Sequence, residues 1–181
     1  AAIIVEELDH ARARNAVIYG EICGYACTGE EISPPADERA IEARVAGVAA
    51  CIEEVLGQAA IDRSRVDYIN AEGNAAVLSD RIETDAIKRV FGDHARRLSV
   101  SSTKAATGHL LCASGAAEII FTALAMQHGI VPPTLNYEQP DPRCDLDYTP
   151  NRSRRREIRA ALSLTLGLSG ENAAVLMRPV A

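Results

Sequence analysis

Strand-like and helix-like segments alternate along almost the whole of this 181-residue chain. Short runs of apolar and β-branched residues are followed by longer stretches in which apolar residues recur at helical spacing, with glycines and prolines between them. This alternation is typical of a layered α/β domain, and two closing strands joined through Gly167 and Gly170 predict an antiparallel part of the sheet. We expect strands at residues 1–5, 17–26, 66–70, 98–101, 158–166 and 172–177, and helices at 6–14, 37–56, 79–91 and 110–128.

Glycines and prolines mark several of the expected boundaries. Gly57 stands where the second helix needs a C-cap, and Pro132-Pro133 ends the last helix. Gly29 and the cluster Ser33-Pro34-Pro35 predict a loop. No linker, internal repeat or low-complexity tract interrupts the pattern, so residues 1–181 are expected to form a single domain. Because the chain begins without methionine inside an apolar run, we also expect it to be a piece of a longer protein.

Composition narrows the class of protein. Apolar residues make up 48% of the chain, enough for one hydrophobic core, and the formal net charge of -6 gives no basic field for nucleic acid. The arginine-rich stretch from Arg152 to Arg159 is expected to be a solvated loop that runs into a strand. Five widely spaced cysteines without a CxxC pair indicate neither disulfides nor a metal site, which favours a cytoplasmic location. No apolar run approaches the ~20 residues of a membrane helix.

The segment Ser101-Ser102-Thr103-Lys104-Ala105-Ala106-Thr107-Gly108-His109 places a lysine and a histidine on a loop that leads into a helix. A neutral histidine there can donate a hydrogen bond to a developing oxyanion, although by pattern alone it is more often a structural cap. The segment is very similar to the lysine and glycine-histidine motif of β-ketoacyl-acyl-carrier-protein synthases. Further blocks resemble the same family in the same order, at residues 66–71, 80–84, 86–92, 132–136 and 144–147.

The resemblance implies a thiolase-like fold of five layers (α/β/α/β/α) built from two similar halves, of which this chain is the second. In the family the first half supplies a cysteine nucleophile, which this chain alone lacks, and the second half supplies two histidines. His109 matches the second histidine, Lys104 the buried lysine before it, and Glu118 the glutamate that pairs with the lysine. A buried lysine needs such a carboxylate because its desolvation is costly.

Several positions depart from the family pattern. Glu72 stands where the family has its first catalytic histidine, and a carboxylate is a poor substitute for a neutral imidazole beside an enolate. Asn74 and Ala76 replace two threonines that contact the pantetheine arm. The glycine-rich gating loop has Leu168 in place of a phenylalanine and Glu171 in place of a threonine. The expected loop residues are Gly167, Leu168, Ser169 and Gly170.

None of the chain's own cysteines is expected to be the missing nucleophile. Cys112 lies three residues after His109, where a histidine can activate a thiolate, but it matches a position at which the family carries a small packed residue. Cys23, Cys27 and Cys51 fall on strand or helix patterns, and Cys144 falls in a loop.

Two functions in fatty-acid or polyketide elongation remain open. In the first, the chain belongs to a catalytically impaired subunit, similar to the chain-length factors that pair with an active synthase, and the loss of the first histidine, both threonines and the gate favours this hypothesis. In the second, it completes an active enzyme of decarboxylative Claisen condensation, which the retention of Lys104, His109 and Glu118 favours. A third hypothesis, an unrelated α/β interaction domain, requires the ordered motif blocks to be coincidence.

Both of the first two hypotheses imply the same partners. These are an N-terminal synthase half or a second synthase-like chain, an acyl carrier protein, and a dimeric assembly. They imply no membrane or nucleic acid, no metal, and no cofactor beyond the phosphopantetheine that carries the substrate. Glycines are not grouped as a nucleotide-binding fingerprint.

Overall fold

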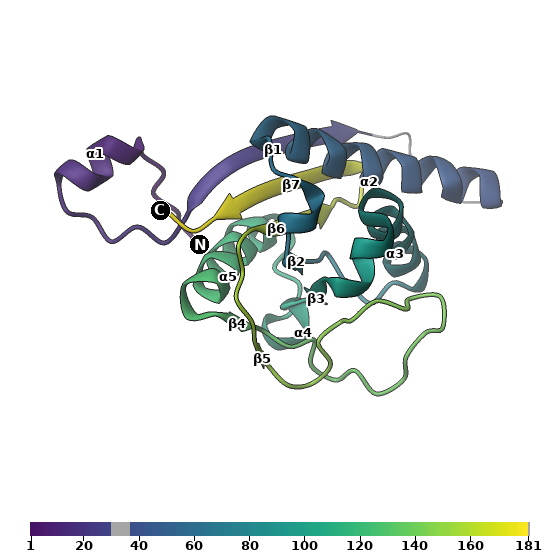
Figure 1. Cartoon of the computed structure of the whole chain (residues 1–181). Coiled ribbons are helices and arrows are strands. Elements are labelled where there is room, and N and C mark those ends of the chain that lie inside the picture. The colour runs from purple at the N-terminus through teal and green to yellow at the C-terminus, as the bar shows by residue number, and fades with distance from the viewer. Residues whose placement is uncertain (30–36, 181) are drawn as a thin grey trace.

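The computed structural model describes residues 1–29 and 37–180, so the loop expected around Pro34-Pro35 lies outside the described residues. A five-stranded sheet in the order β1-β7-β6-β2-β3 forms the centre (Figure 1). The strands β1, β7 and β6 are antiparallel neighbours, whereas β2 runs parallel to both β6 and β3. The bounds are β1 Glu21–Gly29, β2 Tyr68–Asn70, β3 Ser99–Ser101, β6 Ala161–Leu166 and β7 Glu171–Arg178, and a separate pair consists of β4 Ile130–Val131 and β5 Arg154–Arg155.

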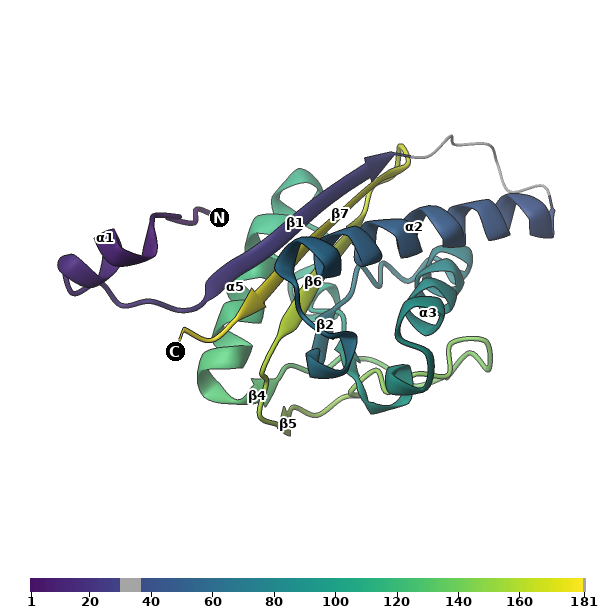
Figure 2. The ribbon, with the colours of Figure 1, turned by 45° about the horizontal axis from the view of Figure 1, so that its top comes forward.

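Helices cover both faces of this sheet, so that the chain is an α/β domain of three layers (Figures 1 and 2). The helix α2 Glu38–Ala59 packs on β1 and β7, and α3 Val77–Phe91 packs beside α2. On the other face, α5 Ser114–His128 packs on β6. The larger hydrophobic core lies between the sheet and the pair α2 and α3, and a smaller core around Tyr68 and Met126 lies under α5.

The helix α2 shows how the sequence builds this packing. The Asp37 side chain accepts the N–H of Ala40 at 2.9 Å and caps the helix. On β1, Gly24 allows close approach, because a Cβ there would lie 2.9 Å from the carbonyl oxygen of Val55. The prediction of Gly57 as the C-cap is wrong: the helix continues to Ala59, and Ala60 ends it with a left-handed φ of 50° and an N–H that bonds back into the last turn.

Residues 1–5 form no strand, which corrects the sequence-based expectation. They lie outside the sheet, with Ile4 86% and Val5 70% exposed, and lead into α1 Leu8–Ala13 at one end of the molecule (Figure 2). Their apolar character predicts burial, but a strand also needs a neighbour that takes its backbone hydrogen bonds. Within the described part of the chain, no strand lies beside them to do so.

Two further boundaries differ from the expected ones. Strand β1 begins at Glu21 instead of residue 17. The expected helix over residues 110–128 is α-helical only from Ser114, because Leu111–Ala113 forms a 3-10 turn (η3) in which Leu111 takes a φ of 51°. Among the described residues, no helix combines the length and apolar character needed to cross a membrane.

Candidate active site

The candidate site lies at the carboxyl ends of β2 and β3. Glu72 follows β2, and Lys104 opens the short helix α4 Lys104–Thr107 directly after β3. Because β2 and β3 are parallel neighbours, their carboxyl ends meet at the same edge of the sheet, which is where α/β domains place their ligands. His109 reaches this edge from the loop after α4, and Glu118 reaches it from α5. The fold therefore brings together the four residues that the sequence singles out as catalytic candidates.

Lys104, Glu72 and Glu118 form a buried charge cluster. The Lys104 Nζ lies 3.1 Å from Glu72 Oε2 and donates a hydrogen bond to Glu118 Oε1. The three side chains are only 6%, 1% and 3% exposed, respectively. Burial raises the pKa of Glu118, and the ion pair with Lys104 opposes that rise. Two carboxylates thus share one ammonium in a place where none of the three is well solvated.

Glu72 is held firmly at the position of the family's first histidine. Besides the contact with Lys104, its Oε2 accepts the backbone N–H of Leu166 at 3.3 Å. Its other oxygen, Oε1, lies 3.7 Å from Nε2 of His109. Glu72 therefore occupies the interior of the site and faces the histidine instead of pointing to solvent.

His109 is oriented by the turn that follows it. Its Nδ1 accepts the N–H of Leu111 at 3.2 Å and lies 3.1 Å from Ser114 Oγ. With Nδ1 acting as acceptor, a neutral ring carries its proton on Nε2, the nitrogen that faces Glu72. The Nε2–H group, which could donate a hydrogen bond to an oxyanion, therefore lies beside the Glu72 carboxylate.

A further buried carboxylate holds the loop that carries Glu72. Glu83, in α3, accepts the N–H of Glu72 at 2.7 Å and that of Gly73 at 3.0 Å. Burial raises the pKa of Glu83 to about 8, although these two hydrogen bonds work in the opposite direction. Gly73 takes a φ of 40°, and a Cβ there would come within 2.5 Å of the Ser102 side chain, so the turn requires glycine.

Two acids that the motifs do not single out, Asp80 and Glu83, lie in the first turns of α3. Burial also raises the pKa of Asp80, against hydrogen bonds from the backbone of Ala75 and Asn74. A signal for Glu83 was present, because it lies one helical turn before Ala86 and Ile87, on the buried side of α3. An acid on an apolar helix face needs a hydrogen-bonding partner, and here the partner is the backbone of the Glu72 loop.

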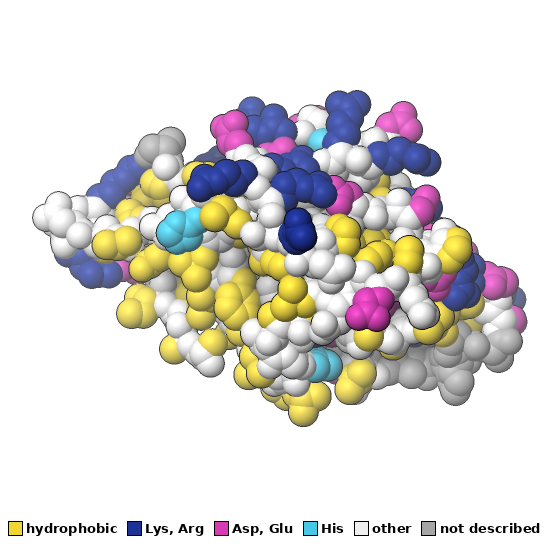
Figure 3. Space-filling model, turned by 90° about the horizontal axis from the view of Figure 1, so that it is seen from below, with side chains coloured by type: hydrophobic (Ala, Val, Ile, Leu, Met, Phe, Trp, Pro, Cys, Tyr) yellow, Lys and Arg dark blue, Asp and Glu magenta, His cyan; other side chains and the backbone are white. Residues whose placement is uncertain are grey.

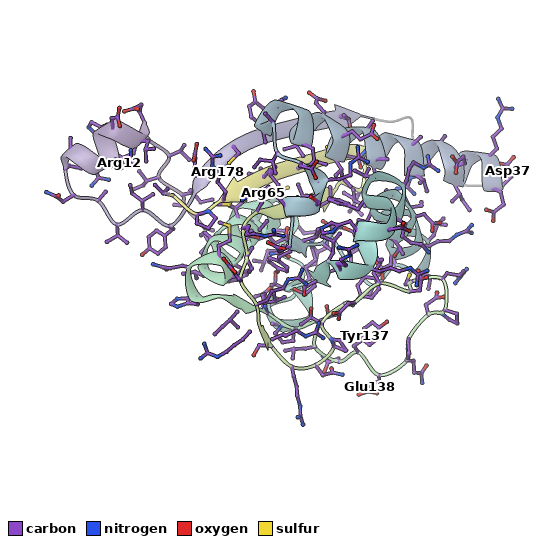
Figure 4. All side chains as sticks on the ribbon, in the orientation of Figure 1. Arg12, Asp37, Arg65, Tyr137, Glu138 and Arg178 are labelled. Atoms are coloured by element: carbon purple, nitrogen blue, oxygen red, sulfur yellow. The ribbon has the colours of Figure 1, made fainter. Side chains whose placement is uncertain are left out.

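An open cavity of about 600 Å³ lies in front of the cluster. Gly73, Asn74, Lys104 and His109 line it, together with the long loop after β4. Figure 4 shows Tyr137, one of the lining residues, on that loop. The Asn74 side chain accepts the N–H of Ala76 at 3.0 Å and so caps its own turn. The lining includes Ala75 and Val77, on either side of Ala76.

The glycine-rich loop between β6 and β7 is a tight turn that stays outside this cavity. The Gly167 N–H donates to the Glu171 backbone carbonyl at 2.6 Å, and the Ser169 N–H donates to the Glu171 carboxylate at 3.2 Å. Gly170 takes a φ of 87°. Leu168 is 75% exposed, so in this structure it does not close the entrance as a gate.

One cysteine, Cys144, lines the cavity, and burial raises the pKa of its thiol. Cys112 is exposed in η3, so the expectation of a packed residue at that position is wrong. Cys51 is buried in α2, where burial raises the pKa of its thiol to about 11. Within residues 1–29 and 37–180, no three His, Cys, Asp or Glu side chains are arranged to hold a metal ion.

An α/β domain with a lysine, a histidine and two glutamates at the carboxyl ends of parallel strands has the layout of a thiolase-like half. The family model described as the β-ketoacyl synthase C-terminal domain matches residues 19–138. The chain therefore belongs to the β-ketoacyl synthase family.

Similar proteins include both fatty-acid and polyketide synthases. The chain is 42% identical to 3-oxoacyl-[acyl-carrier-protein] synthase 2 of Coxiella burnetii over 180 residues, 99% of the chain and 42% of that protein. It is 44% identical to Nodulation protein E of Rhizobium sp. (strain N33) over 98% of the chain and 42% of the relative. It is 43% identical to a putative polyketide beta-ketoacyl synthase 1 of Streptomyces halstedii over 98% of the chain and 41% of the relative.

Solved structures agree with this family. A type II polyketide ketosynthase in complex with its acyl-carrier protein has a TM-score of 0.89 and 37% identity, over 97% of this chain and 42% of the other. The ishigamide ketosynthase/chain length factor has a TM-score of 0.87 and 30% identity, over 96% of this chain and 41% of the other. The thiolase-like α/β fold is thereby confirmed. The chain spans about two fifths of the length of these relatives.

Proposed function

We propose that this chain is the C-terminal half of a chain-length-factor-like subunit, with impaired condensation chemistry, in fatty-acid or polyketide elongation. The observation that carries the proposal is the buried Glu72, which Lys104 and the Leu166 N–H hold at the first histidine position. Decarboxylation of a malonyl thioester produces an enolate, and a carboxylate close to that oxyanion raises the barrier. Glu72 also attracts the Nε2 side of His109, the one histidine retained.

The entry side of the cavity supports the same proposal. Asn74 uses its side-chain oxygen to cap its own turn, and Ala76 has no side-chain polar group, so neither offers a free hydroxyl to a pantetheine arm. We infer that a carrier-bound acyl chain is positioned less tightly here than in an active synthase. The phosphopantetheine belongs to the substrate, and no resident cofactor is proposed.

The alternative is the second half of an active condensing enzyme. Its support is the retained geometry of Lys104, Glu118 and His109. In that case the N-terminal half supplies a cysteine thiolate that carries the acyl chain. The malonyl group loses CO₂, its enolate carbon attacks the acyl thioester, and the cysteine leaves as thiolate.

Substitution of His109 by Ala separates these two functions. In a silent subunit we expect the variant to lose ~1 kcal/mol of stability, because the Nδ1 contacts with Leu111 and Ser114 disappear, with little change in the turnover of an active partner. The measurements are the melting temperature and malonyl decarboxylation of the chain assembled with its synthase half. An unchanged melting temperature with decarboxylation reduced about a hundredfold would support the active enzyme instead.

Substitution of Glu72 by His alone is expected not to restore condensation. The pantetheine arm would still lack its contacts at Asn74 and Ala76, and positioning supplies a large share of such a barrier. The triple variant Glu72→His/Asn74→Thr/Ala76→Thr should condense at least about tenfold faster than the single variant. Equal rates for the two variants would show that pantetheine positioning is not what limits this site.

As partners we propose an N-terminal synthase half or a second synthase-like chain, an acyl carrier protein, and a dimeric assembly. One similar solved structure contains a ketosynthase in complex with its acyl-carrier protein, and another is a ketosynthase/chain length factor. In this chain, the face of α5 turned away from the sheet contributes Phe121 and Leu124 to an apolar groove of about 350 Å³. Apolar side chains are widespread on the side seen in Figure 3.

We therefore expect the isolated chain not to behave as a soluble monomer. The groove beside α5 and the apolar residues 1–5 leave hydrophobic surface that a partner half would cover. Sedimentation of the chain at micromolar concentration, alone and with its synthase half, measures this. A monodisperse, cooperatively folded monomer would contradict the expectation.

A further inference from the structure

Five exposed arginines form a basic surface that the proposed function does not use. They are Arg65 in η1 (Arg63–Arg65), Arg96 and Arg97 in η2 (Gly92–Arg97), and Arg152 and Arg155 in the segment around β5. We call these five residues the arginine face. Figure 3 shows that Lys and Arg side chains outnumber acidic ones along the upper part of the view.

Hydrogen bonds tie together the three segments that carry this surface. The Arg156 side chain donates to the carbonyl of Arg97 at 2.6 Å and to Ser99 Oγ at 2.9 Å. The Arg159 side chain donates to the carbonyl of Ser64 at 3.2 Å. The ends of η1 and η2 are thus fixed against residues 156–159, although they are far apart in sequence.

The surface carries more positive than negative charge. The pKa of Asp145 is lowered by its pair with Lys88, 2.7 Å away, and also by the charge of Arg96. Asp67 pairs with Arg159 at 2.7 Å and with Arg156 at 3.6 Å, and Asp147 pairs with Arg154. These acids already have partners. In the part of the chain that the structure describes, no residue of the arginine face has a carboxylate within 4.0 Å.

Most of the arginine face lies at the opposite end of the sheet from the candidate active site. Residues 65 and 97 precede β2 and β3, whereas Glu72 and Lys104 follow them. Both strands run in the same direction, so their amino and carboxyl ends lie on opposite sides. Arg152 lies nearer the site, because the preceding Asn151 bonds to Thr134 and Tyr137, which line the cavity. The test below therefore leaves Arg152 unchanged.

We propose that the arginine face docks an acidic surface of another protein. Planar guanidinium groups bind carboxylates in bidentate fashion, and five unpaired ones form a dense set of such donors. Two other anionic partners fit less well. The exposed large hydrophobic side chains lie elsewhere, at residues 3–5, 17–25, 77, 110–111, 135 and 168, so the face has neither aromatic rings to stack bases nor apolar side chains to enter a lipid surface.

Binding at such a surface depends on charge and is sensitive to salt. Exposed charges steer association and are screened over a Debye length of about 8 Å at physiological ionic strength. Arg156 and Arg159 hold the segments together through Asp67, so the test leaves them unchanged.

The test compares two triple variants of the full chain assembled with its synthase half. The face variant Arg96→Gln/Arg97→Gln/Arg155→Gln and the control Arg12→Gln/Arg14→Gln/Arg39→Gln remove the same charge from different places. Each is titrated with a labelled polyglutamate peptide, a single-stranded oligonucleotide of equal charge, and vesicles containing anionic lipid, at low and physiological salt. Circular dichroism melting confirms that both variants remain folded.

We expect the face variant to bind the peptide at least about tenfold more weakly than the parent protein, and the control to change the affinity less than about twofold. The oligonucleotide and the vesicles should bind more weakly than the peptide and respond little to either variant. Equal peptide affinity for the two variants, or no peptide binding by the parent at low salt, overturns the proposal. The proposal is also overturned if the parent protein binds the oligonucleotide or the vesicles more tightly than the peptide and the face variant loses that binding. The arginine face would then bind a different class of partner.

Discussion

Replacing Lys104 by Met is expected to lower the free energy of unfolding by about 3–5 kcal/mol. The substitution keeps the length of the side chain but removes the ammonium that lies between Glu72 and Glu118, whose side chains are 1% and 3% exposed. Two carboxylates would then remain in an environment that solvates neither, and uncompensated buried charge is among the most costly defects in a protein. Urea unfolding of the chain assembled with its synthase half measures the loss.

Two comparisons isolate the charge effect. Lys88→Met removes an exposed lysine that pairs with Asp145 at 2.7 Å, and we expect almost no loss there. The triple variant Lys104→Met/Glu72→Gln/Glu118→Gln should recover most of the stability, because neither carboxylate of the cluster is then left without its ammonium. If Lys104→Met were as stable as Lys88→Met, the three residues would not form the charge cluster that we describe.

The stability of the protein is expected to fall as the pH rises from about 4.5 to about 8. Burial raises the pKa of Glu83 from its ordinary value of 4.5 to about 8. Below pH 4.5 this carboxyl is protonated in both the folded and the unfolded chain and contributes no pH dependence. Between the two values the unfolded chain loses the proton while the folded chain keeps it, so the unfolded state binds fewer protons and stability decreases.

The expected loss from Glu83 over this window is on the order of a few kcal/mol, since each pKa unit corresponds to about 1.4 kcal/mol. The raised pKa values of Glu118 and Asp80 act in the same direction. Glu83→Gln should flatten the curve of unfolding free energy against pH, whereas Glu53→Gln, on the exposed side of α2, should leave it sloping. Stability that increased over this range, or a slope unaffected by Glu83→Gln, would contradict the role of burial.

Local patterns predicted much of the fold. Val45, Val48, Ile52 and Val55 recur at helical spacing and form the buried side of α2, as the sequence indicates. The strands β2 and β3 lie within the predicted ranges, because short buried runs between helices have few alternatives in a layered domain. Capping was less predictable: Ala60 ends α2 although Gly57 is the better residue for that conformation.

Residues 1–5 show where local pattern is insufficient. Their composition indicates a buried strand, but pairing depends on a neighbour that is far away in sequence or in another chain. The apolar pattern therefore predicts that the segment can be buried, but it does not identify the surface against which the segment packs.

In the candidate site, too, the sequence predicts some features and the tertiary structure decides the others. The resemblance of ordered sequence blocks to the β-ketoacyl synthases is enough to single out Lys104, His109, Glu118 and Glu72. Only the tertiary structure decides that Glu72 shares Lys104 with Glu118, that it faces His109 at 3.7 Å, and that Glu83 holds its loop. These contacts join residues up to 37 positions apart, as for Glu72 and His109, and the charge balance of a buried group depends on all its neighbours at once. The sequence by itself determined which candidate side chains are present. Their burial among distant segments determined which charges and hydrogen bonds each side chain meets.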